Sequence, residues 1–407
     1  MSLTPPRPLP DPLRLAQRVA DIEPFWVMEC AKAADALART PACDPAQGGE
    51  RMLYLNIGEP DETAPPAVVA AAQQCLDAGR TQYTPAVGLP ALRQALSDWY
   101  ASRWGVDVAP QRIVVTAGAS AALQLLCTAL VEPGDEFLMP DPCYPCNRHF
   151  VTASGGTARL IPTTPAQRFQ LDAASVAQAW GPDTRGVMLA SPSNPTGTSV
   201  PADTLAEIVA AVRVRGGLTV VDEIYLGLSY DGEARTALSL AAADDVVVVN
   251  SFSKYFGMTG WRLGWLVLPE ALVPAVEKLA QNLYICPSSI AQHAALACFT
   301  PATLALCEQR RASMQARRDF IVPALEALGL PVPVQPDGAF YVWFDVTAHA
   351  PDSWQFCFDM LERAHVALTP GRDFGHAETG RYARLSFASA ADDLHDAVRR
   401  LQRVLGR

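Results

Sequence analysis

Seven short apolar segments alternate with helical stretches through the middle of this chain, and this alternation limits the folds open to it. The segments span residues 113–116, 136–139, 157–161, 187–190, 218–222, 246–250 and 263–268. Apolar runs of about four to eight residues suit strands that are buried on both faces, as in parallel sheets covered by helices. Parallel strands are joined by right-handed crossovers. The pattern predicts an α/β fold whose large doubly wound domain holds a mostly parallel seven-stranded sheet.

Beyond about residue 287 the pattern changes to long helices and fewer strands. Residues 302–328 are rich in arginine, alanine and leucine and predict one long helix with a charged face. The stretches 339–346 and 384–387 predict strands, and 391–405 predicts a closing amphipathic helix. These elements indicate a second, smaller α+β domain.

The two patterns divide the chain into three parts. We expect a large domain at residues 55–286 and a smaller C-terminal domain at 287–407. The N-terminal segment, 1–54, is expected to pack with the small domain. A length of 407 residues agrees with about two to three domains.

Composition and charge exclude several classes of partner. Half of the residues are hydrophobic, and the net charge of −10 argues against nucleic acid or an anionic membrane as a main partner. No apolar run reaches the length of roughly 18 residues that a membrane span needs. The proline-rich start, 1–12, lacks the basic-then-apolar pattern of a signal peptide. We therefore expect a cytoplasmic protein.

Ten cysteines raise the question of disulfides or a metal site. A large chain without an export signal is expected to keep its thiols reduced. Cys143 and Cys146 have the spacing of redox and zinc sites, yet no second pair or histidine follows at ligand spacing. We expect no metal, and we interpret the other cysteines as small apolar residues of the core.

Lysine is scarce, since 3 lysines stand against 29 arginines. Arginine stays protonated, whereas lysine can lose its proton and then condense with an aldehyde to form a Schiff base. Lys254 follows the apolar run 246–249, which places its amine at the edge where open α/β sheets bind ligands. For Lys32 and Lys278 an exposed lysine is the simpler interpretation. Lys254 is therefore the candidate for a functional amine.

Hydroxyl and guanidinium groups flank this lysine. Ser251, Ser253 and Arg262 suit a phosphate dianion, because arginine binds phosphate through two hydrogen bonds and serine adds neutral donors. A lysine able to form a Schiff base beside a phosphate-binding arginine points to pyridoxal 5′-phosphate as the cofactor.

That cofactor needs a carboxylate opposite its ring nitrogen, which keeps the ring protonated. Asp222 ends the apolar run 218–221, so its carboxylate would lie at the same edge of the sheet. Tyr225 could donate a hydrogen bond to the phenolic oxygen of the cofactor. Asn194, which follows the strand expected at 187–190, is a second candidate donor to that oxygen.

With these residues the chain resembles the class I/II pyridoxal-phosphate-dependent aminotransferases of fold type I, from about residue 56 to residue 388. The resemblance rests on further segments that occur in the family's order: 56–61, 82–93, 116–120, 141–145, 338–341 and 384–388. No single segment is decisive, but together and in order they are specific.

The turn 116–120 precedes the helical run 121–130, and a helix N-terminus with free backbone amides favours an anion. The resemblance assigns binding of the cofactor phosphate to three residues of this turn: Gly118, Ala119 and Ser120. Taken alone, such a turn would be a simple helix cap.

The resemblance implies tasks for two tyrosines that would otherwise be interpreted as a core and a loop residue. Tyr144 would stack on the cofactor ring. Tyr83 would reach the phosphate bound by the neighbouring subunit, so a homodimer is expected. Three residues are expected to bind substrate, with the arginine holding the α-carboxylate: Gly58, Asn194 and Arg384.

The implied activity is ping-pong transamination, in which an α-amino acid becomes a 2-oxo acid. Lys254 would carry the cofactor as a Schiff base and then act as the general base. Asp222 and Tyr225 complete the expected catalytic group.

Three other functions share parts of this pattern. Ser251 and Lys254 fit the Ser-x-x-Lys of penicillin-binding proteins, but the chain lacks Ser-Asp-Asn and Lys-Thr-Gly. A ligand-sensing regulator would need a DNA-binding domain, and the residues before Asn56 are too few and too poor in basic residues for one. A β-lyase or a cyclopropane-forming enzyme would use the same Lys254, Asp222 and Arg384, so the sequence leaves this alternative open.

Substrate choice is the least determined property. Some aspartate-preferring relatives place a lysine where this chain has Ser120. The apolar segment 25–28 suggests a pocket that also accepts uncharged side chains. We expect neutral donors such as alanine or an aromatic amino acid, with 2-oxoglutarate as an acceptor.

Overall fold

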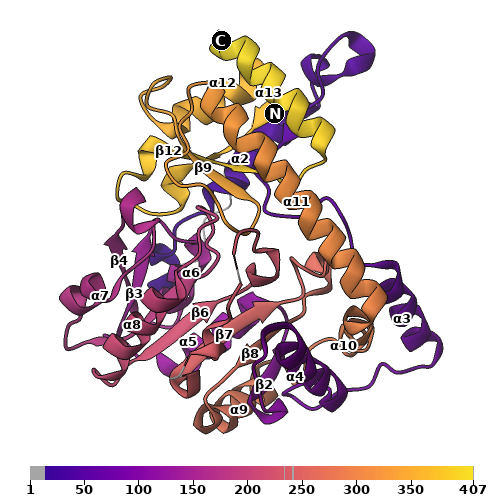
Figure 1. Ribbon diagram of the computed structural model, residues 1–407, viewed down its shortest axis with the longest axis vertical. Helices are drawn as coiled ribbons and strands as arrows, with labels where there is room; N and C mark the ends of the chain where they lie inside the picture. Colours follow the sequence, from indigo (N-terminus) through magenta and orange to yellow (C-terminus); the bar gives the residue numbers. More distant parts are fainter. Residues whose placement is uncertain (1–13, 233, 241–242, 407) are drawn as a thin grey trace.

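The computed structural model describes residues 14–232, 234–240 and 243–406 (Figure 1). A seven-stranded sheet with the order β2-β8-β7-β6-β5-β3-β4 lies at its centre. The strands are β2 (Ile113–Thr116), β3 (Glu136–Asp141), β4 (Thr157–Pro162), β5 (Thr184–Ala190), β6 (Leu218–Asp222), β7 (Val246–Ser251) and β8 (Gly264–Val267). All seven lie where the sequence predicts them, with ends that differ by at most three residues.

Strand direction confirms the mostly parallel arrangement. β3 pairs in parallel with both β4 and β5, β5 pairs in parallel with β6, and β6 does so with β7. β8 runs antiparallel to both of its neighbours, β2 and β7. The carboxyl ends of β5, β6 and β7 therefore meet at one edge of the sheet.

Helices cover both faces of this sheet, as the doubly wound pattern requires. Val246 and Val248 pack on one side and Val247 and Val249 on the other, and all four are fully buried. Helices α4 (Pro90–Trp104), α7 (Ala173–Ala179) and α8 (Ala202–Arg213) pack on the first side. Helices α5 (Ala119–Leu130), α6 (Pro145–Ala153) and α9 (Val273–Leu283) pack on the second.

A smaller antiparallel sheet, in the order β11-β12-β9, is built from the C-terminal part of the chain. Its strands are β9 (Tyr341–Asp345), β11 (Thr369–Pro370) and β12 (Tyr382–Ser386). The helices of this part are α11 (Pro301–Ala327), α12 (Ser353–Ala364) and α13 (Ala391–Leu405). α11 is the long helix predicted from residue 302, and it runs from beside α10 (Ser289–Ala295) and α3 (Pro66–Asp77) to the small sheet (Figure 1).

The N-terminal segment joins this C-terminal part. Helix α2 (Trp26–Ala38) contributes Val27 to a cluster with Trp343, Phe374 and Tyr382. Strand β1 (Leu53–Tyr54) pairs in parallel with β10 (Val366–Ala367). The sequence does not predict β1, β10 or β11, because two residues are too few for a periodic pattern. The expected domain boundaries at residues 55 and 287 stay a prediction.

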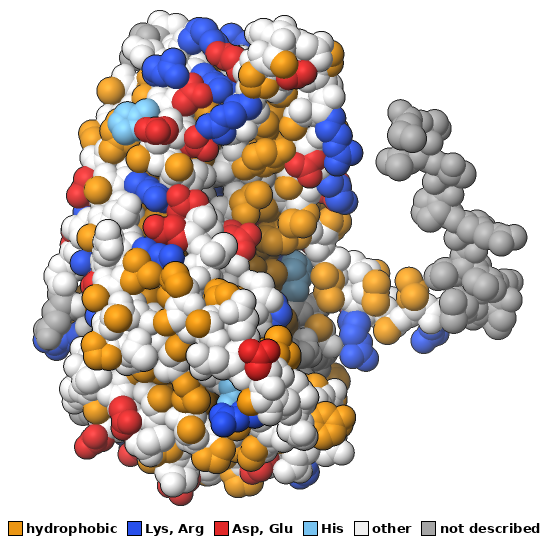
Figure 2. Space-filling model, turned by 90° about the vertical axis from the view of Figure 1, so that its right-hand side faces the viewer, with side chains coloured by type: hydrophobic (Ala, Val, Ile, Leu, Met, Phe, Trp, Pro, Cys, Tyr) orange, Lys and Arg blue, Asp and Glu red, His pale blue; other side chains and the backbone are white. Residues whose placement is uncertain are grey.

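The remaining observations concern the surface. The first described residues include α1 (Arg18–Asp21), where Arg18 donates to the carbonyl of Ala153 (3.2 Å). Basic and acidic side chains are interspersed on the face shown in Figure 2 rather than gathered by sign. The proline-rich start, 1–12, lies outside the described residues.

Within the described ranges no single helix is long and apolar enough to cross a membrane. One pair, Ser289–Phe299 and Pro301–Ala327, passes that test together by length and composition, with a bend of 83° between its members. The same residues contain no group of three potential metal ligands, and all ten cysteines are free thiols.

Candidate active site

A cavity of about 460 Å³ opens at the sheet edge where β5, β6 and β7 end. Residues from α2, from the start of α5 and from the small sheet complete its wall. Most of the predicted site residues line it: Gly58, Ala119, Ser120, Tyr144, Asn194, Asp222, Tyr225, Ser253, Lys254, Arg262 and Arg384. The structure thus brings together residues that are separated by more than three hundred positions in the chain.

Lys254 lies three residues beyond the end of β7, and its partly buried amine faces this cavity. Its Nζ donates a 2.6 Å hydrogen bond to the carbonyl oxygen of Gly58. Burial lowers the pKa of Lys254 to about 8, and the nearby Arg262 and Arg384 guanidinium groups act in the same direction. A neutral amine, the form that attacks a carbonyl carbon, is therefore accessible near neutral pH.

The N-terminus of α5 and Arg262 form the end of the cavity that suits an anion. Gly118 caps α5 without any side-chain hydrogen bond, so the first backbone amides are not covered by a capping side chain. The Arg262 Nη2 packs so close to Gly118 that a Cβ there would lie 2.6 Å from it. Ser120 and Ser253 add hydroxyls to the same cavity wall.

Ser251 lies behind this end rather than on the cavity wall. Its buried Oγ is 2.8 Å from Ser253 Oγ and 3.0 Å from the carbonyl oxygen of Leu263, and it accepts from the Ser253 amide (3.0 Å). Ser251 therefore orients Ser253, and its predicted contact with the cofactor stays a prediction.

Asp222 presents a buried carboxylate to the cavity from the last position of β6. It accepts a 3.1 Å hydrogen bond from the backbone amide of Ile224. Burial raises the pKa of Asp222 to about 6, while that amide and Lys254 oppose the rise. A cationic ring nitrogen placed here would supply the positive partner that this carboxylate needs.

Arg384 enters the cavity from β12 and is held by a network of hydrogen bonds. Its Nη1 donates to Asn194 Oδ1 (2.8 Å), and its Nη2 donates to the carbonyl of Asn56 (2.7 Å) and to Thr369 Oγ1 (3.2 Å). The rings of Tyr341 and Phe374 lie 4.4 and 4.9 Å from its Cζ. Its Nε has no partner among the described residues, so one buried donor is left for a ligand.

Two phenol hydroxyls meet beside this arginine. Tyr225 Oη and Tyr341 Oη are 2.8 Å apart, and both side chains are buried. The sequence predicted Tyr225 as a site residue and placed Tyr341 only in a family segment. Tyr341 is the last residue of that segment, 338–341, and the first residue of β9. Its place at the start of a strand was the signal that sequence reasoning missed.

The remaining predicted residues are placed as follows. Tyr144 lines the cavity at the start of α6, with its ring edge-on to Phe25 (centroids 6.1 Å apart). Tyr83 is 78% exposed and is absent from the cavity wall, so within one chain it does not reach this site. Its loop is anchored by a 2.6 Å hydrogen bond from Ser289 Oγ to the carbonyl of Gln82.

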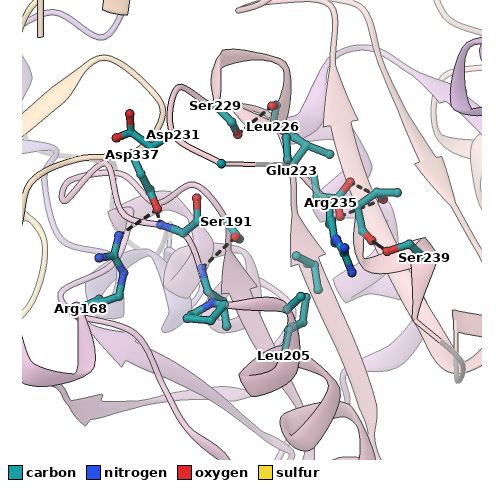
Figure 3. Close-up of a pocket in the computed structure, with 18 of the residues that line it drawn as sticks. Arg168, Ser191, Leu205, Glu223, Leu226, Ser229, Asp231, Arg235, Ser239 and Asp337 are labelled. Atoms are coloured by element: carbon teal, nitrogen blue, oxygen red, sulfur yellow. Dashed lines mark hydrogen bonds and ion pairs between the residues drawn. The ribbon is translucent and has the colours of Figure 1, made fainter. Parts of the chain in front are cut away.

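A second, larger cavity of about 670 Å³ is lined by Glu223, the residue that follows β6 (Figure 3). Glu223 faces it, whereas Asp222 faces the first cavity. The Glu223 carboxylate accepts from the Ala237 amide (2.6 Å), and Arg168 pairs with Asp337 (2.9 Å). Burial raises the pKa of Glu223 to about 8. Glu223, Arg168 and Asp337 thus already have partners within the chain. The predicted site residues line the first cavity instead.

Comparison with known proteins agrees with this geometry. A model of the family described as "Aminotransferase class I and II" matches residues 50–401. The chain belongs to this family. It is 39% identical to the valine–pyruvate aminotransferase of Mycobacterium tuberculosis, over 95% of this chain and 97% of the relative.

Two solved structures resemble this aminotransferase over nearly its whole length. An aminotransferase from Mycobacterium tuberculosis has a TM-score of 0.91 at 38% identity, covering 97% of this chain and 99% of that one. The aspartate aminotransferase of Thermus thermophilus with maleate has a TM-score of 0.88 at 34% identity, covering 96% and 100%. This aminotransferase therefore has fold type I and uses pyridoxal 5′-phosphate.

The cavity residues fit that cofactor. An anion site at α5 and Arg262 stands at one end, and the buried carboxylate of Asp222 suits the ring nitrogen. Lys254 presents the amine, and Arg384 retains a donor for a carboxylate. The cavity thus offers a partner for each part of the cofactor and substrate: the phosphate, the pyridinium ring and the amino acid.

Proposed function

We propose that this aminotransferase transfers the amino group of a neutral α-amino acid to a 2-oxo acid, with Lys254 as its general base. One observation carries the proposal. Lys254 shares a single cavity with one arginine for each anionic end, Arg262 for the phosphate and Arg384 for the α-carboxylate. Both guanidinium groups lie near enough to act electrostatically on this amine, whose pKa is lowered to about 8, chiefly by burial.

Pyridoxal phosphate supplies, when bound, an aldehyde carbon and a ring that accepts electrons. Lys254 holds the cofactor covalently and, once released, moves a proton at the α-carbon of the substrate. Arg384 fixes the substrate carboxylate, which keeps that α-carbon within reach of the Lys254 amine. Gly58 lies at the substrate side, where its carbonyl already contacts this amine.

The other predicted residues bind the cofactor in this proposal. Asp222 accepts a hydrogen bond from the ring nitrogen and keeps it cationic. Tyr225 and Asn194 donate to the phenolic oxygen; because Asn194 Oδ1 accepts from Arg384, its amide nitrogen is left to donate. Gly118, Ala119, Ser120, Ser253 and Arg262 form the phosphate site, Ser251 supports it by orienting Ser253, and Tyr144 stacks on the ring.

The substrate side chain is proposed to be uncharged, because apolar side chains contribute much of the cavity lining. They belong to Phe25, Val27, Met28, Ala31, Ile57, Leu123, Phe150 and Ile224. Among the described residues that line the cavity, the cations are Lys254, Arg262 and Arg384, and each already has a task. Arg148, on neighbouring α6, donates to Glu23 and to the carbonyl of Asp373 instead.

Relatives of both kinds of preference exist, so a direct assay is needed. The valine–pyruvate relative supports a neutral donor, whereas the Thermus relative is named for aspartate. A screen of the twenty amino acids with 2-oxoglutarate, pyruvate and other 2-oxo acids should show turnover of aliphatic or aromatic donors. Strict selectivity for aspartate and glutamate would overturn the neutral pocket.

The same screen separates transamination from the alternative on this fold. A β-lyase would release ammonia and pyruvate without any 2-oxo acid acceptor, whereas a transaminase needs the acceptor for a second turnover. We propose a cytoplasmic homodimer, in which Tyr83 of one subunit completes the phosphate site of the other.

A further inference from the structure

Tyr341 connects two parts of the site that the proposed roles treat separately. It is the first residue of β9, it is 1% exposed, and it lines the active-site cavity. Its hydroxyl lies 2.8 Å from that of Tyr225, and its ring centroid lies 4.4 Å from the Cζ of Arg384.

The hydrogen-bonding capacity of a phenol decides the direction of this contact. A tyrosine hydroxyl donates one hydrogen bond and accepts others. If Tyr225 donates its proton to the phenolic oxygen of the cofactor, it has none left for Tyr341. The 2.8 Å contact must then be a hydrogen bond donated by Tyr341 and accepted by Tyr225.

Two neighbours, Arg384 and Gly58, hold Tyr341 where it can make this bond. In the β9–β12 register Arg384 lies opposite Trp343, so Tyr341 is its diagonal neighbour on the same face of the small sheet. On the other side a Cβ at Gly58 would lie 2.4 Å from Tyr341 Oη, so only glycine leaves room for the hydroxyl. Burial raises the pKa of Tyr341, and the Arg384 guanidinium opposes that rise. The guanidinium thereby makes the Tyr341 hydroxyl a better hydrogen-bond donor.

We propose that Tyr341 is a positioning residue that acts through Tyr225: it donates a hydrogen bond that turns the Tyr225 proton toward the cofactor's phenolic oxygen. The inference rests on the proposed role of Tyr225. A residue of the small sheet, Tyr341, would thus influence the cofactor's phenolic oxygen, although Tyr225 follows a strand of the large sheet.

We call the two hydrogen bonds, from Tyr341 to Tyr225 and from Tyr225 to the cofactor's phenolic oxygen, the tyrosine relay. The pH dependence of the visible absorption of the cofactor-loaded protein tests this relay. The midpoint of the absorption change reports the proton held at the Lys254 nitrogen. Losing a hydrogen bond to the phenolic oxygen leaves more negative charge there to hold that proton, so the midpoint rises. Tyr341→Phe keeps the ring on Arg384 and removes the hydroxyl alone. It should raise the midpoint by about half a pH unit, as expected for one neutral hydrogen bond acting indirectly.

Two further variants make the result specific. Tyr225→Phe should raise the midpoint by more, and adding Tyr341→Phe to it should give no further rise, because the relay then has no second member. Tyr382→Phe, on the adjacent strand β12 and away from the cavity wall, is the matched control and should leave the midpoint unchanged.

The outcomes separate this inference from the proposed function. An unchanged midpoint in Tyr341→Phe, or an equal rise with and without Tyr225, would overturn the relay and leave the proposed function intact. A parent protein that develops no visible absorption with pyridoxal phosphate would overturn both.

Discussion

Lys254 Nζ donates a 2.6 Å hydrogen bond to the carbonyl oxygen of Gly58, which precedes it by 196 residues. The same glycine leaves room for the hydroxyl of Tyr341. One loop therefore touches both the reactive amine and the tyrosine pair. The proposed base is thus linked through Gly58 to the surroundings of the tyrosine pair.

The reactive amine should be identifiable by chemical trapping. Borohydride treatment of the cofactor-loaded protein should fix the cofactor to the peptide that contains Lys254, as found by mass spectrometry. Lys254→Ala should lower turnover by more than about 10⁴-fold, because both the covalent attachment and the general base are lost. Lys278→Ala, on the exposed face of α9, is the control and should keep both properties. A label on another residue would contradict the assignment.

Stability of the cofactor-free protein should depend on the same amine. The pKa of Lys254 is lowered to about 8 in the folded protein, against about 10.4 in an unfolded chain. Between these values the unfolded chain binds more protons, so this group makes the folded state more stable as pH rises. The destabilisation caused by burying the protonated Lys254 amine is fully present below about pH 8 and disappears above about pH 10.4.

Lys254→Met should therefore unfold at a higher urea concentration than the parent at pH 7. Its free energy of unfolding should be larger by on the order of 1 kcal/mol, after allowance for the partial exposure of Lys254. The difference should shrink as the pH approaches 10. A gap for Lys254→Met that stayed constant with pH would show that its cause is not the amine's titration.

Asp222 and Arg262 should fail in opposite ways. Asp222→Ala removes the partner of the ring nitrogen, so turnover should fall far more than cofactor affinity. Arg262→Ala removes a phosphate contact, so cofactor affinity should fall by roughly 2–4 kcal/mol, measured by equilibrium dialysis. Equal behaviour of the two variants would refute this division of tasks.

Subunit mixing tests the proposed contribution of Tyr83. Lys254→Ala and Tyr83→Ala homodimers should each be nearly inactive. A mixed dimer would contain one site with both Lys254 and the partner's intact tyrosine, so activity should return on mixing. With random exchange about half of the dimers are mixed, and each has one intact site out of two. Activity should therefore approach about a quarter of the parent value. Two separately purified variants that gain nothing on mixing, although exchange is verified by mass, would exclude the shared site.

The large sheet could be predicted because its strands carry a local signal. Val246–Val249 are four consecutive valines with both faces buried, a pattern that survives without knowledge of any partner. Asp222 and Lys254 could be predicted for a related reason: each follows such a run and must reach the same edge of a parallel sheet.

The rest of the site depends on contacts that no local pattern encodes. Tyr341 meets Arg384 only through the register of β9 and β12, and it meets Gly58 only when the first and last parts of the chain come together. The position of Ser251 behind Ser253 likewise follows from hydrogen bonds to Leu263 rather than from spacing. For Tyr83, the chain on its own shows only an exposed side chain.

The order of the small sheet has a consequence for biosynthesis. Its middle strand, β12, comes after every other strand of the described residues, and both β9 and β11 hydrogen-bond to it. A ribosome that has released every residue up to α12 has therefore produced Lys254 and Asp222 but not the strand that carries Arg384. The part of the cavity wall that Arg384 contributes therefore cannot form until β12 has been made. Truncations that stop short of β12 should expose the apolar faces of β9 and α2 to aggregation.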